Sequence, residues 1–441
     1  MWYDSRHSNQ RTVIRKDITM KTKAVRLYGK NDLRLEAFEL PKIKDDEILA
    51  KVISDSICMS SYKAAQQGSD HKRVPKDVAT NPIIIGHEFC GELVEVGAKW
   101  AGQFKVGDKF AIQPAMNHPD NVYAAPGYSF PHIGGAATYI VIPAKVMERG
   151  CLLPYMGEAF YFGSLGEPMS CIVGGFNVNY HYVKPGSYEH AMGIVAGGNM
   201  ALLAGVGPMG LGAIDFALHG PRQPGRLVVT DIDPARLARA ASIYTVEEAK
   251  RCGVELVYLN TSGVADVVAE LMKLSGGKGY NDVYVFAPVP VVVEQGDAIL
   301  GYDGCLNFFA GPTDPAFAAK FNFYNVHYNL THVAGNSGGT TEDLIEALEV
   351  MAAGKVNPSA MITHVGGLDC VAETTLHLPK IPGGKKLIYT QISMPLTAIA
   401  DFEKLGADNC VFAGLAKIVA AHNNLWCAEA EKFLLANAAC I

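Results

Sequence analysis

The 441-residue chain lacks long hydrophobic runs, a strong excess of one charge and clustered cysteines. Without about 20 consecutive apolar residues, no membrane-spanning helix is predicted. The net charge of −6 gives no general attraction to nucleic acid or anionic membranes. The ten cysteines are scattered and contain no CxxC, so no disulfide framework is indicated, and this usage is typical of a protein of the reducing cytoplasm. We therefore expect a cytoplasmic protein that binds neither nucleic acid nor a membrane.

The first 19 residues are polar and lack the apolar centre of a secretory signal. We expect residues 1–19 to be a disordered extension or a misassigned start, because a second methionine, Met20, directly precedes a strand-like segment. The remaining length is too great for one ordinary core and predicts at least two domains.

Two different sequence patterns follow one another along the chain. Residues 20–175 contain short strand-like segments bounded by Gly, Pro, Asn or Asp, which predict a β-rich, barrel-like domain. In residues 176–335, apolar strands alternate with helical segments, the pattern of a doubly wound parallel sheet. Residues 336–393 read as a helix followed by a β-like stretch. The chain is therefore predicted to be of the α/β class.

Residues 394–441 read as two or three amphipathic helices. Trp426, Phe433 and Leu434 fall roughly on one face of the last one. We expect this stripe to dock on the body of the protein or on another subunit.

A nucleotide-binding signature lies in NMALLAGVGPMGLGAIDFALHG, where an apolar strand leads through a GxGxxG into a helix. The next strand ends at Asp231, which lies 21 residues after the last glycine. The glycines allow a tight turn, close approach of a pyrophosphate and close packing, and the helix N-terminus attracts phosphate. The predicted cofactor-binding residues of this loop are Gly205, Gly207, Pro208, Met209 and Gly210.

The acidic residue bears on the choice of nicotinamide cofactor. Asp231 would accept hydrogen bonds from the ribose hydroxyls and repel a 2′-phosphate, which favours NAD(H). Arg236 lies close enough in sequence to leave NADP(H) open. The alternative, a glycine-rich turn that only permits packing, would not require strand, helix and acid in register.

Four further residues have the chemistry of metal ligands. Cys58 follows a strand, His87 and Glu88 form a pair behind Gly86, and Glu167 precedes a proline at an apparent helix start. Thiolate, imidazole and carboxylate are the groups that bind zinc. Their spacing alone does not show that they converge, and each taken singly would be an ordinary buried or surface residue.

The order of these elements resembles the zinc-dependent medium-chain dehydrogenase/reductases, in particular their sorbitol dehydrogenase-like branch. The resemblance runs from Met20 to about Thr390 and is carried by Cys58 with Ser60, by the Gly-His-Glu triplet ending at Glu88, and by the GxGPxG loop. It implies a GroES-like catalytic domain in two parts, 20–175 and 336–393. These parts flank a Rossmann domain.

The resemblance also implies roles for individual residues. Cys58, His87 and Glu167 would surround one catalytic zinc, and Glu88 would lie beside the metal, either as an exchangeable ligand or as a partner of the ligands. Ser60 would relay a proton from the substrate alcohol. A small-molecule partner, a sugar phosphate or polyol, and a homodimer or homotetramer are expected.

The sequence departs from the family pattern at two places. The lobe that binds a second, structural zinc in many relatives corresponds to residues 113–132, which contain no cysteine, so no structural zinc is expected. The usual Gly-Ser-Asp after the zinc cysteine is here Met59-Ser60-Ser61. The sequence therefore does not show which side chain takes the place of the aspartate beside the zinc ligands.

Basic side chains after the zinc cysteine bear on the substrate. Lys63, His71, Lys72 and Arg73 bring positive charge to a segment that borders the substrate cleft in this family, and they would bind a phosphate. The alternative is a solvated charged loop. The SxCxSxYK pattern and the tail look like the L-sorbose-1-phosphate reductases, which implies reduction of L-sorbose 1-phosphate to glucitol 6-phosphate.

Three other functions stay open at this point. One is an unphosphorylated, sorbitol-type polyol dehydrogenase, and a second is a zinc-free NADPH-dependent reductase. A third, from another class, is a nucleotide-binding protein without turnover.

Overall fold

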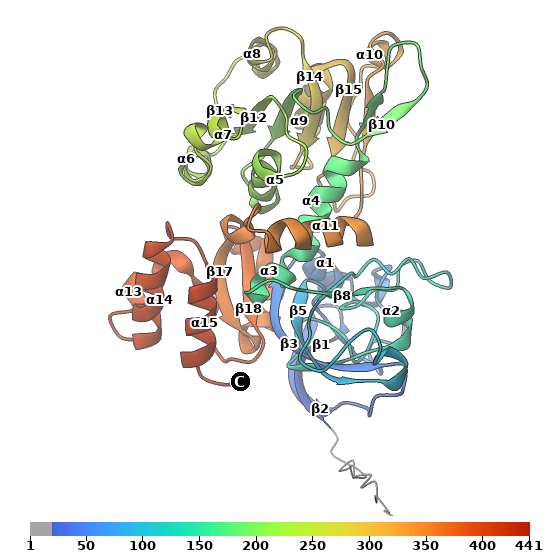
Figure 1. Ribbon diagram of the computed structural model, residues 1–441, viewed down its shortest axis with the longest axis vertical. Coiled ribbons are helices and arrows are strands. Elements are labelled where there is room, and N and C mark those ends of the chain that lie inside the picture. The colour runs from blue at the N-terminus through green and yellow to red at the C-terminus, as the bar shows by residue number, and fades with distance from the viewer. Residues whose placement is uncertain (1–19) are drawn as a thin grey trace, which may run out of the picture.

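The computed structural model describes residues 20–441, so the extension predicted for residues 1–19 lies outside the described residues. The chain forms two bodies, one built on a mixed sheet and one on a parallel sheet (Figure 1). The predicted combination of a GroES-like β-rich part and a Rossmann part is confirmed. Within the described residues, no helix has both the length and the apolar character needed to cross a membrane.

The first body, called here the catalytic body, contains an eight-stranded sheet in the order β19-β17-β18-β3-β5-β6-β8, with β7 also paired to β3. Strand β18, from late in the chain, runs antiparallel to β3, so segments far apart in sequence share one sheet. A smaller sheet has the order β2-β1-β4. The strands are β1 (Lys21–Gly29), β2 (Asp32–Glu39), β3 (Ile48–Ile57), β4 (Ile83–Ile84), β5 (Phe89–Val96), β6 (Lys109–Ile112), β7 (Tyr139–Ile142), β8 (Leu152–Pro154), β17 (Ile362–Gly367), β18 (Lys385–Tyr389) and β19 (Thr397–Ala398).

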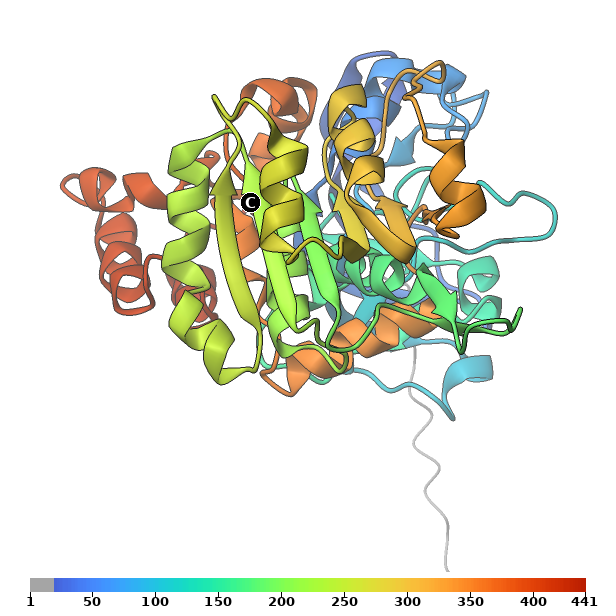
Figure 2. The same ribbon diagram turned by 90° about the horizontal axis from the view of Figure 1, so that it is seen from above.

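The second body is a six-stranded parallel sheet in the order β13-β12-β11-β14-β15-β16. Helices lie on both of its faces (Figure 2), which explains why its strands are continuous apolar runs. The strands are β11 (Asn199–Leu203), β12 (Arg226–Asp231), β13 (Glu255–Asn260), β14 (Tyr280–Val285), β15 (Leu300–Phe308) and β16 (His332–Ala334). The helices are α5 (Pro208–His219), α6 (Pro234–Ile243), α7 (Val246–Arg251), α8 (Val267–Leu274), α9 (Pro290–Ala298) and α10 (Phe323–Tyr328).

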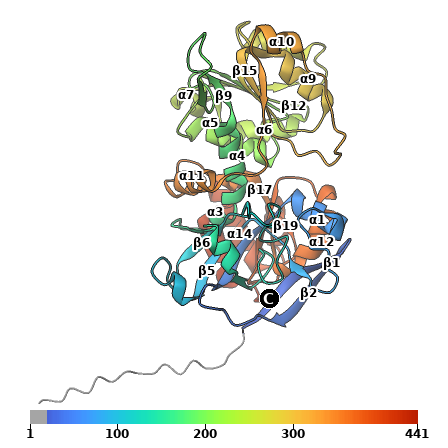
Figure 3. The same cartoon turned by 90° about the vertical axis from the view of Figure 1, so that its right-hand side faces the viewer.

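Helix α4 (Gly166–Val178) runs from the catalytic body to the parallel sheet, and α11 (Thr341–Ala352) packs against it (Figures 1 and 3). Beyond α4, a short antiparallel hairpin of β9 (Tyr180–Tyr182) and β10 (His190–Met192) lies beside β15. The remaining α-helices of the catalytic body are α1 (Met59–Gln67), α2 (Ala144–Glu148), α3 (Phe160–Ser164) and α12 (Val371–His377).

The C-terminal segment forms α13 (Phe402–Leu405), α14 (Cys410–Ala421) and α15 (Ala428–Asn437) along the catalytic body (Figure 1). Trp426 and Leu434 are buried in one core cluster with Tyr389 of β18, so the predicted stripe docks on the body. Trp426 lies just before α15 rather than on it, and its indole N–H donates to the Tyr389 hydroxyl at 2.8 Å.

Candidate active site

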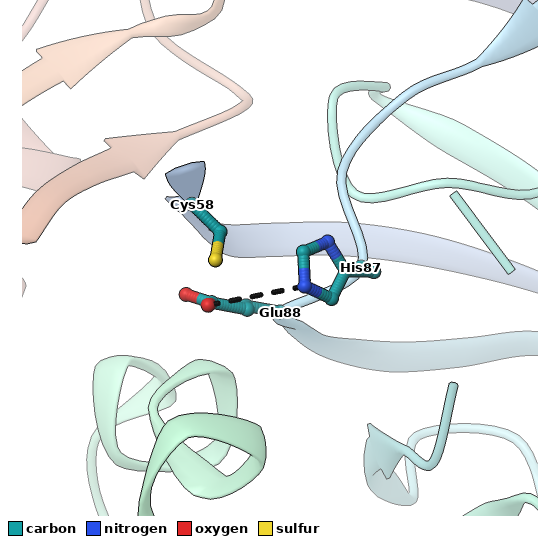
Figure 4. Close-up of side chains that lie close together, drawn as sticks. All are labelled: Cys58, His87 and Glu88. Carbon is teal, nitrogen blue, oxygen red and sulfur yellow. Dashed lines mark ion pairs between the residues drawn. The ribbon is translucent and has the colours of Figure 1, made fainter. Parts of the chain in front are cut away.

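Cys58, His87 and Glu88 come together where β3 ends and β5 begins (Figure 4). These strands are antiparallel neighbours, and Asp55 pairs with Phe89, so the residues just beyond each strand must meet. One potential ligand atom from each of the three side chains lies within 4.8 Å of the other two. The predicted convergence of a thiol, an imidazole and a carboxylate is therefore present in the structure.

Gly86 sets the direction in which the pair behind it points. Its φ of 93° lies in the left-handed region, and a Cβ there would meet a carboxylate oxygen of Asp55 at 2.5 Å and the backbone nitrogen of Ala136 at 2.8 Å. Only glycine fits this position without strain or collision. The turn therefore directs His87 and Glu88 into the interior.

His87 is held in a neutral form with defined neighbours. Burial lowers its pKa to about 4, so the imidazole is uncharged at neutral pH. Its Nδ1 lies 3.4 Å from the hydroxyl of Ser61, and its Nε2 lies 3.3 Å from the hydroxyls of both Ser60 and Tyr128. Ser61 thus contacts the histidine from the position where the family pattern has aspartate. A neutral imidazole retains a lone pair that can bind a metal.

Cys58 occupies the N-cap position of α1, and its thiol makes no capping hydrogen bond but points into the same cluster. Burial and then the charge of Glu88 raise its pKa to about 11. The Ser60 hydroxyl donates to Cys58 Sγ at 3.0 Å. A thiolate at this place needs a cation beside it, and a buried thiol next to a neutral imidazole and carboxylates is a donor set that zinc prefers. The residues present therefore fit a zinc ion.

Glu88 forms an ion pair that the sequence analysis did not identify. Lys385 Nζ donates to both carboxylate oxygens of Glu88, at 2.6 and 2.7 Å, and the Ser56 hydroxyl also donates to this carboxylate. The lysine side chain is 7% exposed and the glutamate 1%. Burial alone would lower the pKa of Lys385, but the charge of Glu88 outweighs it and raises that pKa above its ordinary value. The signal in the sequence was two lysines opening an otherwise apolar strand, KKLIY.

Glu167 lies in the first turn of α4 and faces the same cavity as Cys58, but it is outside the compact three-residue cluster. Its carboxylate accepts a hydrogen bond from the Cys171 thiol at 3.7 Å. Burial and then the charge of Glu88 raise the pKa of Glu167 to about 7. The structure therefore places Glu88 closer to the cysteine–histidine pair than the predicted ligand Glu167.

The cluster opens into a cavity of about 960 Å³ that is also lined by Met209 of the glycine loop and, besides His87 and Lys385, by four further basic residues. Lys63 Nζ donates to the Gly311 carbonyl at 3.1 Å, and the Arg73 guanidinium lies 5.0 Å from the centre of the Tyr128 ring. The basic residues are Lys63, His71, Lys72 and Arg73.

One of these four does not carry the expected charge. Burial and then the charge of Arg73 lower the pKa of His71 to about 4. Of these four residues, Lys63, Lys72 and Arg73 therefore carry the positive charge at neutral pH.

The glycine loop joins β11 to α5, with Pro208 at the first position of the helix. A Cβ on Gly210 would lie 2.1 Å from the Gly205 carbonyl oxygen, so the helix start packs against the loop only with glycine there. The left-handed residue of the turn is Ala204, with φ of 53°, and a Cβ on Gly205 would lie 2.8 Å from the Leu202 carbonyl oxygen. A Cβ on Gly207 would meet nothing within 4 Å, which leaves open space beside the loop.

Asp231 ends β12, the strand next to β11, and the Gly205 N–H donates to the Thr230 carbonyl at 2.8 Å. Since the two strands are parallel, the acid and the glycine loop lie at the same sheet edge. Asp231 Oδ1 accepts from the Asp233 N–H at 3.0 Å. Arg236 on α6 is largely exposed, with Nε 3.6 Å from Asp233 Oδ2.

Two family models match the chain. The one described as "Alcohol dehydrogenase GroES-like domain" matches residues 44–150, and "Zinc-binding dehydrogenase" matches residues 208–353. The crystal structure of 2R,3R-butanediol dehydrogenase from Bacillus subtilis is similar in fold, with a TM-score of 0.65 and 23% identity. That similarity covers 83% of this chain and 99% of the other.

Two curated relatives are similar over almost their whole length. The mannitol-1-phosphate 5-dehydrogenase of Aliivibrio fischeri is 53% identical over 418 residues, which cover 95% of this chain and 98% of that protein. The L-sorbose 1-phosphate reductase of Klebsiella pneumoniae is 50% identical over 417 residues, with the same two coverages. The chain therefore belongs to the zinc-dependent medium-chain dehydrogenase/reductase family, in its sorbitol dehydrogenase-like branch.

Proposed function

We propose that the protein is a zinc-dependent oxidoreductase that transfers hydride between NAD(P)(H) and a phosphorylated ketose or polyol, acting on L-sorbose 1-phosphate to give glucitol 6-phosphate. The observation that carries this proposal is that one cavity contains the Cys58–His87–Glu88 cluster, Met209 of the nucleotide loop, and basic side chains. The two relatives named above support it, since both names concern phosphorylated six-carbon sugars or polyols.

In this proposal Cys58, His87 and Glu167 hold one catalytic zinc ion. When bound, zinc supplies Lewis-acid chemistry that polarises the oxygen of the reacting carbonyl or alcohol. Glu88 acts beside the ligands rather than as a permanent one, because its two oxygens already accept from Lys385 and Ser56.

The nicotinamide cofactor supplies the hydride chemistry. The free N–H groups at the start of α5 and the open space beside Gly207 suit the pyrophosphate. Asp231 accepts from the ribose hydroxyls, which favours NAD(H). Arg236, at the first turn of α6, is the side chain that would accept NADP(H) instead.

A proton must reach the substrate oxygen when the carbonyl is reduced. The Ser60 hydroxyl donates to Cys58 Sγ at 3.0 Å, and the Tyr128 hydroxyl donates to Ser60 at 2.8 Å. Burial raises the pKa of Tyr128 well above its ordinary value, so the phenol keeps its proton and remains a donor. Ser60 therefore relays the proton: its hydroxyl would give its proton to the substrate oxygen and take one from solvent water, while Tyr128 orients the serine hydroxyl.

Lys63 and Arg73 bind the phosphate of the substrate through charge-assisted hydrogen bonds. The competing function is an unphosphorylated polyol dehydrogenase. It is favoured by the bond that Lys63 already makes to Gly311, which occupies that lysine without any phosphate.

The test is a panel of ketose and polyol phosphates, each beside its unphosphorylated form, assayed with NADH and with NADPH. We expect turnover of the phosphorylated compounds, with lower KM for NADH than for NADPH. Lys63→Ala should raise KM for the phosphorylated ketose about tenfold, the effect of losing roughly 1.4 kcal/mol of binding.

Lys76→Ala is the matched control, because Lys76 is an exposed lysine that donates to the Ser69 carbonyl and is not among the residues that line this cavity. It should leave KM unchanged. Activity confined to unphosphorylated polyols would refute the phosphate assignment and support the competing function.

A further inference from the structure

A second cluster of potential metal ligands lies in the parallel-sheet body, away from the catalytic cavity. It consists of His181 on β9, Asp303 on β15 and His332 on β16, and one ligand atom from each lies within 4.8 Å of the other two. The cavity is reached by the carboxyl ends of β15 and β16, whereas Asp303 is five residues earlier on β15, a span of roughly 16 Å in a strand. None of the three residues lines the cavity, although His332 directly precedes Val333, which does, so the cluster lies outside the catalytic cluster of Cys58 and His87.

The three side chains are largely shielded from solvent, with exposures of 9% for His181, 15% for Asp303 and 14% for His332. His181 Nδ1 lies 3.9 Å from one carboxylate oxygen of Asp303, and His332 Nδ1 lies 4.0 Å from the other. The carboxylate thus lies between the two Nδ1 atoms.

The other nitrogen of each imidazole already has a fixed acceptor. His181 Nε2 lies 3.1 Å from Asp282 Oδ1, and His332 Nε2 lies 2.6 Å from the Tyr180 carbonyl oxygen. Asp282 is itself held by the side-chain amide of Asn179 at 2.6 Å. A histidine that donates one N–H to a carboxylate or carbonyl presents the lone pair of its other nitrogen, which is the usual arrangement behind a metal-bound imidazole.

The two Nδ1 atoms cannot remain as bare lone pairs. They lie 2.9 Å from the Asp303 carbonyl oxygen and 3.0 Å from the Leu330 carbonyl oxygen, so each unprotonated Nδ1 would face another electron-rich atom. A positive centre is required at these nitrogens, either a bound cation or a proton on each.

Asp303 provides an independent sign of the same need. Its φ of 56° is in the left-handed region, and its Oδ2 accepts from the Tyr182 N–H at 2.8 Å. Its Oδ1 is buried and has no hydrogen-bond partner among residues 20–441. A buried carboxylate oxygen without a donor is unfavourable, and a cation beside it would satisfy it.

We propose that His181, Asp303 and His332 bind a divalent transition-metal ion of the zinc type. Two imidazoles and a carboxylate form a nitrogen–oxygen set that suits zinc and its neighbours in the first transition row. Around a tetrahedral ion with bonds of about 2.0–2.1 Å, ligand atoms stand roughly 3.4 Å apart. The ligand atoms of the cluster lie within 4.8 Å of one another, so they need to close by up to about 1.4 Å. The ion would tie the β9–β10 hairpin and strand β16 to β15.

The test uses the Cys58→Ser variant, which removes the thiolate from the catalytic cluster, loaded with Co²⁺ and then dialysed. We expect about one bound cobalt per chain with a visible d–d spectrum and no thiolate-to-cobalt charge-transfer band. Adding His332→Gln, or the more conservative Asp303→Asn, should remove this cobalt. The wild type should bind two equivalents, and Asp303→Asn alone should bind one and keep the thiolate band.

Equal cobalt contents of the Cys58→Ser protein with and without Asp303→Asn would overturn the proposal. Absence of cobalt in a folded Cys58→Ser protein would also overturn it and would assign two protonated histidines to the cluster. Failure of the catalytic proposal would give a different result, because the thiolate-to-cobalt band would then be absent from the wild type.

Discussion

Replacing Lys385 by methionine should destabilise the metal-free protein by about 3–5 kcal/mol, the range for removing one partner of a buried ion pair. Methionine keeps an unbranched side chain, one heavy atom shorter than lysine, and removes the charge. Glu88, 1% exposed, would then keep the Ser56 hydroxyl as donor but lose the ammonium group that contacts both of its oxygens. The large effect comes from the carboxylate left behind and not from the lost contact itself.

The assay is urea unfolding followed by tryptophan fluorescence. Trp100 and Trp426 both lie in the catalytic body, so their emission reports on the sheet that holds the pair. The protein is first freed of metal, because a bound cation would replace the missing charge. The midpoint should fall while the slope of the transition stays constant.

The neighbouring lysine supplies a matched control. Lys386 is also buried, but its Nζ donates only to the carbonyls of Pro382 and Gly384, and burial lowers its pKa to about 8. Lys386→Met leaves no buried charge without a partner, so it should cost only about 0.5–1.5 kcal/mol.

The double variant Glu88→Gln with Lys385→Met should lose about 1–3 kcal/mol less than the sum of the two single variants, since a glutamine needs no cation. Equal losses for Lys385→Met and Lys386→Met, or additive effects in the double variant, would refute the reasoning.

Three further predictions concern other parts of the chain. Gly210→Ala places a Cβ 2.1 Å from the Gly205 carbonyl oxygen, so the loop must shift. A fluorescence titration should then show NADH binding at least about tenfold weaker, a loss of roughly 1.4 kcal/mol, while the circular dichroism spectrum stays unchanged. The hydrogen bond to Asp215 at 2.7 Å raises the pKa of His219. The stabilisation from this pair is therefore fully present below about pH 6.5 and is lost as the pH rises through the folded-state pKa. Urea unfolding of His219→Gln should show a free energy of unfolding about 1–2 kcal/mol below that of the wild type at pH 6, and this difference should shrink by pH 9. Glu431→Leu removes the buried acceptor of two backbone N–H groups of α3 and should cost about 2–4 kcal/mol, measured by urea unfolding, whereas equal stability of the leucine variant and wild type would contradict that role.

Much of the fold could be predicted because its signals are local. The alternation of apolar strands and helices between residues 176 and 335 gave the parallel sheet, and the glycine loop before Asp231 identified its binding edge. His87 was also identifiable, since it lies in a short triplet behind a glycine that the turn requires.

The partners of the site residues were not predictable from the sequence. Lys385 is 297 positions from Glu88, and only the antiparallel pairing of β18 with β3 brings them together. Tyr128 comes from the cysteine-free lobe, where no motif distinguishes it from a surface loop residue. The neutral state of His71 follows from burial and from Arg73, neither of which a charge count reveals. Such contacts depend on tertiary packing and leave no pattern in the local sequence.

The central claim is that the Cys58–His87 cluster supports metal-dependent reduction of a ketose phosphate. It is tested most directly by the initial rate of NADH oxidation with L-sorbose 1-phosphate, measured on metal-free protein, after addition of Zn²⁺, and on Cys58→Ser treated in the same way. We predict no turnover without metal, recovery of the rate with Zn²⁺, and no recovery in the variant. Undiminished turnover by the metal-free protein, or by Cys58→Ser, would contradict the account.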